Sequence, residues 1–105
     1  MFQSGRHNSG RLLALRSVPN ATPWSRYGYA LPKRVGNAVV RNRIRRRLRE
    51  LLRLLPVSEG YDLVITARPE AAKASFAELK AELTLLLRRA RLLPSPVPPP
   101  EPPSA

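Results

Sequence analysis

Residues 33–55 read KRVGNAVVRNRIRRRLRELLRLL, and this stretch combines a helical apolar stripe with a high density of arginine. Asn37 stands before the apolar residues as a candidate N-cap, and Pro56 follows the stretch as a helix terminator. The apolar residues recur at spacings of four, four, three and four, which places them on one face of a helix: Val40, Ile44, Leu48, Leu51 and Leu55. The pattern predicts an amphipathic helix with a narrow apolar side.

Basic residues dominate the remainder of this stretch. Between Lys33 and Arg53 there are nine basic residues and a single acid, Glu50. An ordinary solvent-exposed helix face mixes both signs, whereas like charges at this density repel one another and require a negatively charged partner. The planar guanidinium donates paired hydrogen bonds to phosphate and stacks on bases, and the turn at Gly36 lets backbone N–H groups approach a phosphate. The stretch therefore favours a nucleic acid as partner.

Two strand-like segments precede the helix. Arg11–Val18 is a compact apolar run, and Arg26–Leu31 alternates Tyr27 and Tyr29 with small or polar residues. Residues 19–23 between them read PNATP, a turn or loop by composition. We expect the two segments to pair with each other as antiparallel strands.

A strand and a second helix follow. Tyr61–Ala67 reads YDLVITA and is apolar on both faces, as in a buried central strand. Ser75 and Glu78 have the spacing of a capping box. The helix that they open would bury Phe76, Leu79, Leu83, Leu86 and Ala90. The order β-β-α-β-α predicts an α+β fold in which two helices cover one small sheet.

Composition excludes several classes of protein. The chain has 105 residues, a formal net charge of +12 and a pI near 11.7, which indicates one small domain with a polyanionic partner. There is no cysteine and His7 is the sole histidine, so disulfide scaffolds, thiolate chemistry and zinc sites are excluded. The seven acids form no carboxylate cluster in the sequence, and we predict no catalytic residue and no metal site.

The same composition bears on location and domain organisation. No apolar run reaches the ~18 residues of a membrane span, and Met1–Gly10 lacks the core of a signal peptide. We expect a cytoplasmic protein with no membrane partner. Residues 1–93 are predicted to form a single RNA-binding α/β domain with a short N-terminal stub at 1–10. Residues 94–105 hold seven of the twelve prolines and are predicted to be a disordered tail.

Basic charge alone leaves DNA, RNA and anionic lipid open. The apolar stripe of the first helix contains no Trp or Phe, which argues against an interfacial membrane helix. The chain has no helix-turn-helix pair, zinc finger or heptad zipper, which argues against sequence-specific reading of DNA. RNA is the partner that remains favoured.

The run from Lys33 to Arg49 closely resembles the signature of the protein component of bacterial ribonuclease P, whose hallmark is Arg41-Asn42-Arg43. The resemblance continues through Tyr61–Arg68 and the last helix, and covers roughly residues 2–93. It implies an α/β sandwich with a mixed sheet of three to four strands. It also implies an unusual left-handed β-α-β crossover, where right-handed connections are the rule, and an N-terminal helix that is truncated here.

The resemblance further implies a non-catalytic subunit of a ribonucleoprotein endoribonuclease. In that family a catalytic RNA with magnesium hydrolyses the phosphodiester at the 5′ end of precursor tRNA, and the protein binds this RNA and the 5′ leader. No protein partner is predicted. Leader contacts would fall on Phe2, Tyr27 and Tyr29. Contacts with the catalytic RNA would fall on Lys33, Arg34, Asn37, Arg41, Asn42, Arg43, Arg45, Arg46 and Arg49.

Two alternatives stay open at this point. Phe2 matches the end of the family's N-terminal helix, so either the true start lies upstream or this version lacks one wall of the leader cleft. The alternative function is a general basic RNA-binding or ribosome-associated protein with no processing role. Dependence on a cognate catalytic RNA separates the two functions.

Overall fold

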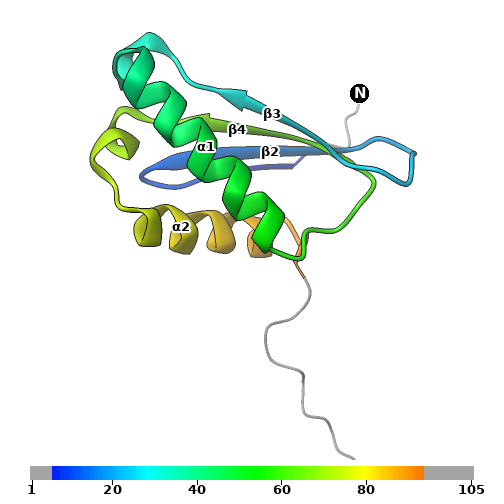
Figure 1. Ribbon diagram of the computed structural model, residues 1–105. Helices are drawn as coiled ribbons and strands as arrows, with labels where there is room; N and C mark the ends of the chain where they lie inside the picture. The colour runs from blue at the N-terminus through cyan, green and yellow to red at the C-terminus, as the bar shows by residue number, and fades with distance from the viewer. Residues whose placement is uncertain (1–5, 94–105) are drawn as a thin grey trace, which may run out of the picture.

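A four-stranded sheet with both α-helices on one face forms the molecule (Figure 1). The computed structural model describes residues 6–93. The elements are β1 (Arg6–Ser9), β2 (Leu13–Pro19), β3 (Arg26–Ala30), the short 3-10 helix η1 (Lys33–Val35), α1 (Ala38–Leu54), β4 (Tyr61–Ala67), a second 3-10 helix η2 (Pro69–Lys73) and α2 (Phe76–Arg89). This is the predicted α+β class with a mixed sheet.

The strand order is β1-β2-β4-β3, which corrects one prediction. We expected β2 and β3 to pair with each other as antiparallel strands, but β4 lies between them, antiparallel to β2 and parallel to β3. Neighbouring strands lie ~4.8 Å apart, so the connection at residues 20–25 must span about twice that distance. A hairpin usually closes with two residues, and this longer loop instead crosses the end of β4.

The connection from β3 through α1 to β4 is left-handed, as predicted. In Figure 1 both strands run towards the left, β4 lies below β3, and α1 returns in front of the sheet. A right-handed connection between the same strands would put α1 on the opposite face. The left-handed path lets α1 and α2 cover the same face and share one core.

That core is built from alternate strand residues and the apolar stripes of the helices. Leu15 in β2 and Ile65 in β4 are directly paired and fully buried. From α1, Ile44, Leu48 and Leu51 are buried as the spacing predicted, while Val40 and the C-cap residue Leu55 pack at the margin. The buried residues of α2 are Leu79, Leu83, Leu86 and Leu87.

The opposite face of the sheet is not covered by any described residue. Alternate positions on β2 and β4 point there, including Arg16 and Val64, and Val64 is 41% exposed. The prediction of a central strand at β4 is therefore confirmed in position, but the strand is buried on one face alone.

Strand β1 was not predicted. Arg6–Ser9 lies within the segment that we expected to be an N-terminal stub, and it pairs antiparallel with β2 at the edge of the sheet. Its sequence, RHNS, has no apolar residue, so hydrophobic periodicity could not reveal it.

None of the helices in the described part of the chain is long and apolar enough to cross a membrane.

Candidate RNA interface

Helix α1 begins as the sequence predicts. Asn37 is the N-cap, and its side-chain oxygen accepts a 3.0 Å hydrogen bond from the backbone N–H of Val40. Gly36 adopts φ +155°, a conformation that L-residues rarely take. This junction sets the direction of α1 relative to η1, which carries Lys33 and Arg34 on the surface.

The predicted contacts with the catalytic RNA form two groups by exposure. Lys33, Arg34, Asn37, Asn42, Arg46 and Arg49 are exposed, whereas Arg41, Arg43 and Arg45 are half-buried. Two of the half-buried side chains are engaged locally. Arg41 Nε donates to the Gly36 carbonyl at 3.2 Å, and Arg45 Nη1 donates to Asn42 Oδ1 at 2.6 Å.

Arg43 and Arg47 reach from α1 to the segment of η2. Arg43 Nη2 donates to the Ala72 carbonyl and Arg47 Nη1 donates to the Ala74 carbonyl, each at 3.3 Å. Arg43 Nε is buried without a hydrogen-bond partner in the described structure. Part of the arginine density therefore holds α1 against η2. From the sequence, Arg43 is expected to contact RNA alone, and Arg47 has no predicted role.

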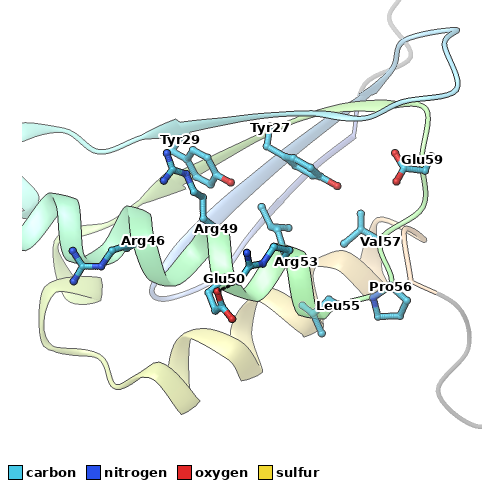
Figure 2. Close-up of a pocket in the computed structure, with 11 residues that line it drawn as sticks. Tyr27, Tyr29, Arg46, Arg49, Glu50, Arg53, Leu55, Pro56, Val57 and Glu59 are labelled. Atoms are coloured by element: carbon cyan, nitrogen blue, oxygen red, sulfur yellow. Dashed lines mark hydrogen bonds and ion pairs between the residues drawn. The ribbon is translucent and has the colours of Figure 1, made fainter.

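The other side of α1 faces β3 across an open cleft of about 1010 Å³ (Figure 2). Tyr27 and Tyr29 line it from β3, because alternate strand residues point to the same face. Arg46 and Arg49 line it from successive turns of α1. Two sets of residues that the sequence assigned to different contacts, leader and catalytic RNA, thus meet in one cleft.

Charge and aromatic surface are combined in this cleft. Burial raises the pKa of Tyr29, and the nearby positive charge of Arg49 opposes the shift. Burial also raises the pKa of Tyr27, and the Glu59 carboxylate adds to the increase. Both phenols are therefore neutral hydrogen-bond donors near neutral pH. A neutral ring beside a guanidinium suits a nucleobase and its phosphate.

The acids around the cleft are few. Glu50 forms an ion pair with Arg53 on the same helix. Among the described residues, no acid forms an ion pair with the other two arginines that line the cleft, Arg46 and Arg49. Glu59 lies at the far end of the cleft and accepts a hydrogen bond from the backbone N–H of Ser25 at 2.9 Å. The potential of the cleft is therefore most positive beside Tyr29.

Two more residues named from the sequence are Phe2, an expected leader contact, and His7, the sole histidine. Phe2 is outside the described residues. His7 is exposed on β1, away from the cleft between β3 and α1. Within residues 6–93, no three His, Cys, Asp or Glu side chains gather in a way that could hold a metal ion.

One exposed aromatic residue was not predicted from the sequence. Trp24, the chain's single tryptophan, is 71% exposed on the loop between β2 and β3. An aromatic residue next to a proline in a loop is a weak signal, because its exposure depends on how the loop folds.

Comparison with known proteins gives one consistent family. The family profile described as Ribonuclease P matches residues 1–91. The ribonuclease P protein component of Chloroflexus aurantiacus is 45% identical over 97 residues, covering 90% of this chain and 72% of that protein. The component of Dehalococcoides mccartyi is 41% identical over 93 residues, covering 89% and 78%.

Solved structures agree on the fold. The ribonuclease P protein of Staphylococcus aureus superposes with a TM-score of 0.78 at 25% identity, covering 86% of this chain and 84% of that one. The protein of Thermotoga maritima gives a TM-score of 0.75 at 24% identity, covering 81% and 83%. From its sequence, its fold and its arginine-rich crossover helix, the chain belongs to the family of ribonuclease P protein components.

Proposed function

We propose that this chain is the RNA-binding subunit of ribonuclease P and assists removal of the 5′ leader from precursor tRNA. The observation that carries the proposal is the arrangement of α1. Its apolar stripe is buried in the core, while Arg46 and Arg49 remain exposed beside the tyrosines of β3. Family membership supports this function over a general RNA-binding role.

In this proposal the protein contributes binding and position, and the catalytic RNA with its magnesium ions carries out the hydrolysis. Guanidinium groups on α1 and the cations of η1 neutralise phosphates of the catalytic RNA. Arg43 and Arg47 support this by holding α1 against η2, so the exposed arginines are presented on a fixed element. The site of action is the cytoplasm, where bacterial RNA is made.

The 5′ leader is assigned to the cleft between β3 and α1. A single strand has unstacked bases, and each base stacked on an aromatic side chain contributes ~1–3 kcal/mol. Tyr27 and Tyr29 lie two residues apart on β3, which spaces their rings by ~6.6 Å along the strand. Arg46 and Arg49 lie opposite, where phosphates of the same strand would lie. Phe2 remains a leader contact proposed from the sequence.

The decisive experiment is cleavage of precursor tRNA by the cognate catalytic RNA at low magnesium, with and without the chain. We expect the chain to stimulate release of the 5′ leader and to lower the magnesium requirement. No stimulation together with no binding to the catalytic RNA would refute the proposed function. Tight binding without stimulation would refute the assignment of the leader while leaving the subunit role intact.

Salt dependence tests the phosphate contacts separately. If about five to seven phosphates are neutralised, the logarithm of the binding constant for the catalytic RNA should fall with the logarithm of salt concentration with a slope of roughly −4 to −6. A slope near zero would show that phosphate contacts do not provide the affinity.

Comparing the affinities for precursor and mature tRNA tests the assignment of the leader to the cleft. Tyr27→Leu combined with Tyr29→Leu should reduce affinity for precursor tRNA but leave affinity for mature tRNA unchanged, because mature tRNA lacks the leader. Leu85→Ala, at a half-exposed position on α2, serves as the control. Equal losses for both tRNAs would contradict a leader contact at the tyrosines.

A further inference from the structure

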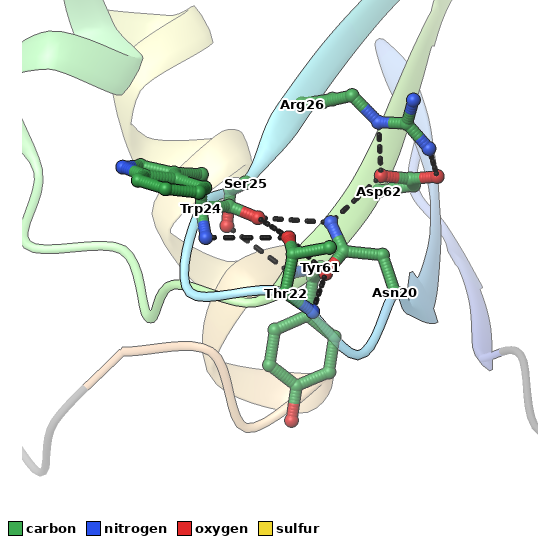
Figure 3. A network of polar contacts seen from close by, with 7 residues as sticks. All are labelled: Asn20, Thr22, Trp24, Ser25, Arg26, Tyr61 and Asp62. Carbon is green, nitrogen blue, oxygen red and sulfur yellow. Dashed lines mark hydrogen bonds and ion pairs between the residues drawn. The ribbon is translucent and has the colours of Figure 1, made fainter.

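The loop between β2 and β3 holds Trp24 in a defined position. Asn20 Nδ2 donates to the Trp24 carbonyl at 2.9 Å, and the Trp24 backbone N–H donates to Thr22 Oγ1 at 3.3 Å (Figure 3). The Thr22 backbone N–H donates in turn to Asn20 Oδ1 at 2.9 Å. The backbone on which the indole is carried is therefore held by side chains of the loop itself.

The loop is also fastened to the segment before β4. The backbone N–H of Asn20 donates to the Gly60 carbonyl at 2.9 Å, and Asn20 Nδ2 donates to Asp62 Oδ1 at 2.9 Å. Ser25 Oγ donates to the Ser58 carbonyl at 3.1 Å. Ala21 takes φ +59°, a left-handed conformation that is unfavourable for an L-residue. These contacts maintain a strained loop whose largest side chain is 71% exposed.

The exposed indole of Trp24 has no packing role among the described residues. Trp24 is not part of the hydrophobic core, and its neighbours in the loop network are polar. A protein interface is built around a contiguous apolar patch, whereas a single flat ring among hydrogen-bonding groups fits the face of one base.

The position of the loop connects it to the cleft. The backbone N–H of Ser25 bonds Glu59, which lines the end of the cleft beyond Tyr27. Tyr27 and Tyr29 line the cleft, and the contact of Ser25 with Glu59 places the loop that carries Trp24 at the Glu59 end of that cleft. Arg26 is not part of this surface, because it pairs with Asp62 on the opposite face of the sheet from Tyr27 and Tyr29.

We infer that Trp24 is a stacking platform for an unpaired nucleobase and extends the RNA path of the cleft over the β2–β3 loop. The inference rests on the proposed function, since it assumes that single-stranded RNA enters the cleft. The ligand is a single-stranded RNA segment, and the contact is independent of base identity because every base presents a π-face.

Tryptophan fluorescence reports directly on RNA bound at Trp24, because Trp24 is the chain's single tryptophan. Intrinsic fluorescence of the full chain should be titrated with a short oligo-uridine RNA, while anisotropy of a labelled copy of that RNA measures binding independently. We expect the emission to be quenched along the same isotherm as the anisotropy, and acrylamide to reach Trp24 less easily in the complex.

Variants then test the energetic contribution. Trp24→Leu should weaken oligo-uridine binding by about 5- to 150-fold, the equivalent of the ~1–3 kcal/mol for one stacked base. Trp24→Phe keeps an aromatic face and should restore most of the affinity. Leu85→Ala removes an apolar side chain that is 45% exposed on α2, and should leave oligo-uridine binding unchanged.

The possible failures are distinguishable. Binding by anisotropy with unchanged Trp24 emission and accessibility would overturn the stacking contact and leave the proposed function standing. No binding by anisotropy would overturn the inference and the assignment of the leader to the cleft, whereas the subunit role is decided by the cleavage assay with the catalytic RNA. A change in emission that depends on protein concentration without RNA would identify Trp24 as a self-association contact, and would overturn the inference. Equal affinities of the Leu and Phe variants would show that the aromatic face is not used.

Discussion

The carboxylate of Glu82 in α2 accepts a 2.7 Å hydrogen bond from the backbone N–H of Leu13, the first residue of β2, although 69 positions separate them in the chain. The backbone N–H of Leu12 donates to the same oxygen, also at 2.7 Å. Gly10 lies against this carboxylate so closely that a Cβ there would come within 2.5 Å of it. Glu82 thus holds the turn between β1 and β2 onto α2.

Removing this carboxylate should destabilise the fold. Glu82→Ala leaves two part-buried N–H groups without an acceptor, and we expect the free energy of unfolding to fall by about 1–3 kcal/mol. Glu82→Gln keeps one acceptor oxygen and should cost less. Urea unfolding of both variants measures the difference, with exposed Glu70→Ala as the control. Equal midpoints for Glu82→Ala and the control would contradict a role for this contact.

The arginines of the cleft should act on RNA binding rather than on stability. Arg46 and Arg49 are exposed, so replacing both with Gln removes two phosphate contacts without opening the core. We expect weaker binding to precursor tRNA, whose leader is assigned to this cleft, and a salt slope less negative by roughly 1.4. Arg88→Gln with Arg89→Gln removes the same charge from the last turn of α2. If both pairs weaken binding equally, net charge rather than position governs the affinity.

Most of the fold could be predicted because its signals are local. The spacing of Ile44, Leu48 and Leu51 placed α1, and Ser75 with Glu78 forms the capping box that their separation predicts. The pairing of β2 with β3 could not be judged from local patterns. The placement of β4 between them depends on which strands pair across long sequence separations, and the sequence of a single segment does not indicate its pairing partner.

The residues of the candidate site could be predicted from the sequence, but their positions relative to one another could not. The exposed residues of α1 and the two tyrosines were both singled out, but nothing in the sequence indicated that Arg49 would lie near Tyr29. Likewise, Arg43 and Arg47 look identical to their neighbours in the sequence. Their bonds to the carbonyls of Ala72 and Ala74 follow from how η2 packs against α1, which is a tertiary contact.

The apolar stripe of α1 should control stability. Ile44 is 1% exposed, and Ile44→Ala removes buried methyl groups and leaves a cavity, so we expect a loss of about 2–5 kcal/mol in the free energy of unfolding. Val39→Ala on the same helix alters a side chain that is 73% exposed and should have little effect. Thermal or urea unfolding monitored by circular dichroism distinguishes the two. A small effect at Ile44 would contradict the packing of α1 on the sheet.

Acid should weaken the network beneath the Trp24 loop. Hydrogen bonds from Arg26 and Asn20 lower the pKa of Asp62, so its contribution to stability is complete above the ordinary carboxyl pKa of ~3.9 and is lost as pH falls through the lowered folded value. The stability difference between the wild type and Asp62→Asn should therefore be present at pH 6 and shrink below about pH 4. Urea unfolding across this range measures it. A stability difference that does not depend on pH would show that the charge of Asp62 does not contribute to stability.

The junction before α1 should couple stability to RNA binding. A Cβ at Gly36 would lie 2.9 Å from Val40 Cγ1, and φ +155° is unfavourable for alanine, so Gly36→Ala should cost more than about 1 kcal/mol. The strain would also move η1, with Lys33 and Arg34, relative to Arg41, whose Nε bonds the Gly36 carbonyl. Gly28→Ala is the matched control, because its Cβ would meet Val64 at an ordinary 3.7 Å. We expect Gly36→Ala to lose affinity for the catalytic RNA even at temperatures where it is fully folded, and Gly28→Ala to lose none. If the folded Gly36→Ala variant binds the RNA as tightly as the wild type, the relative placement of η1 and α1 does not contribute to recognition.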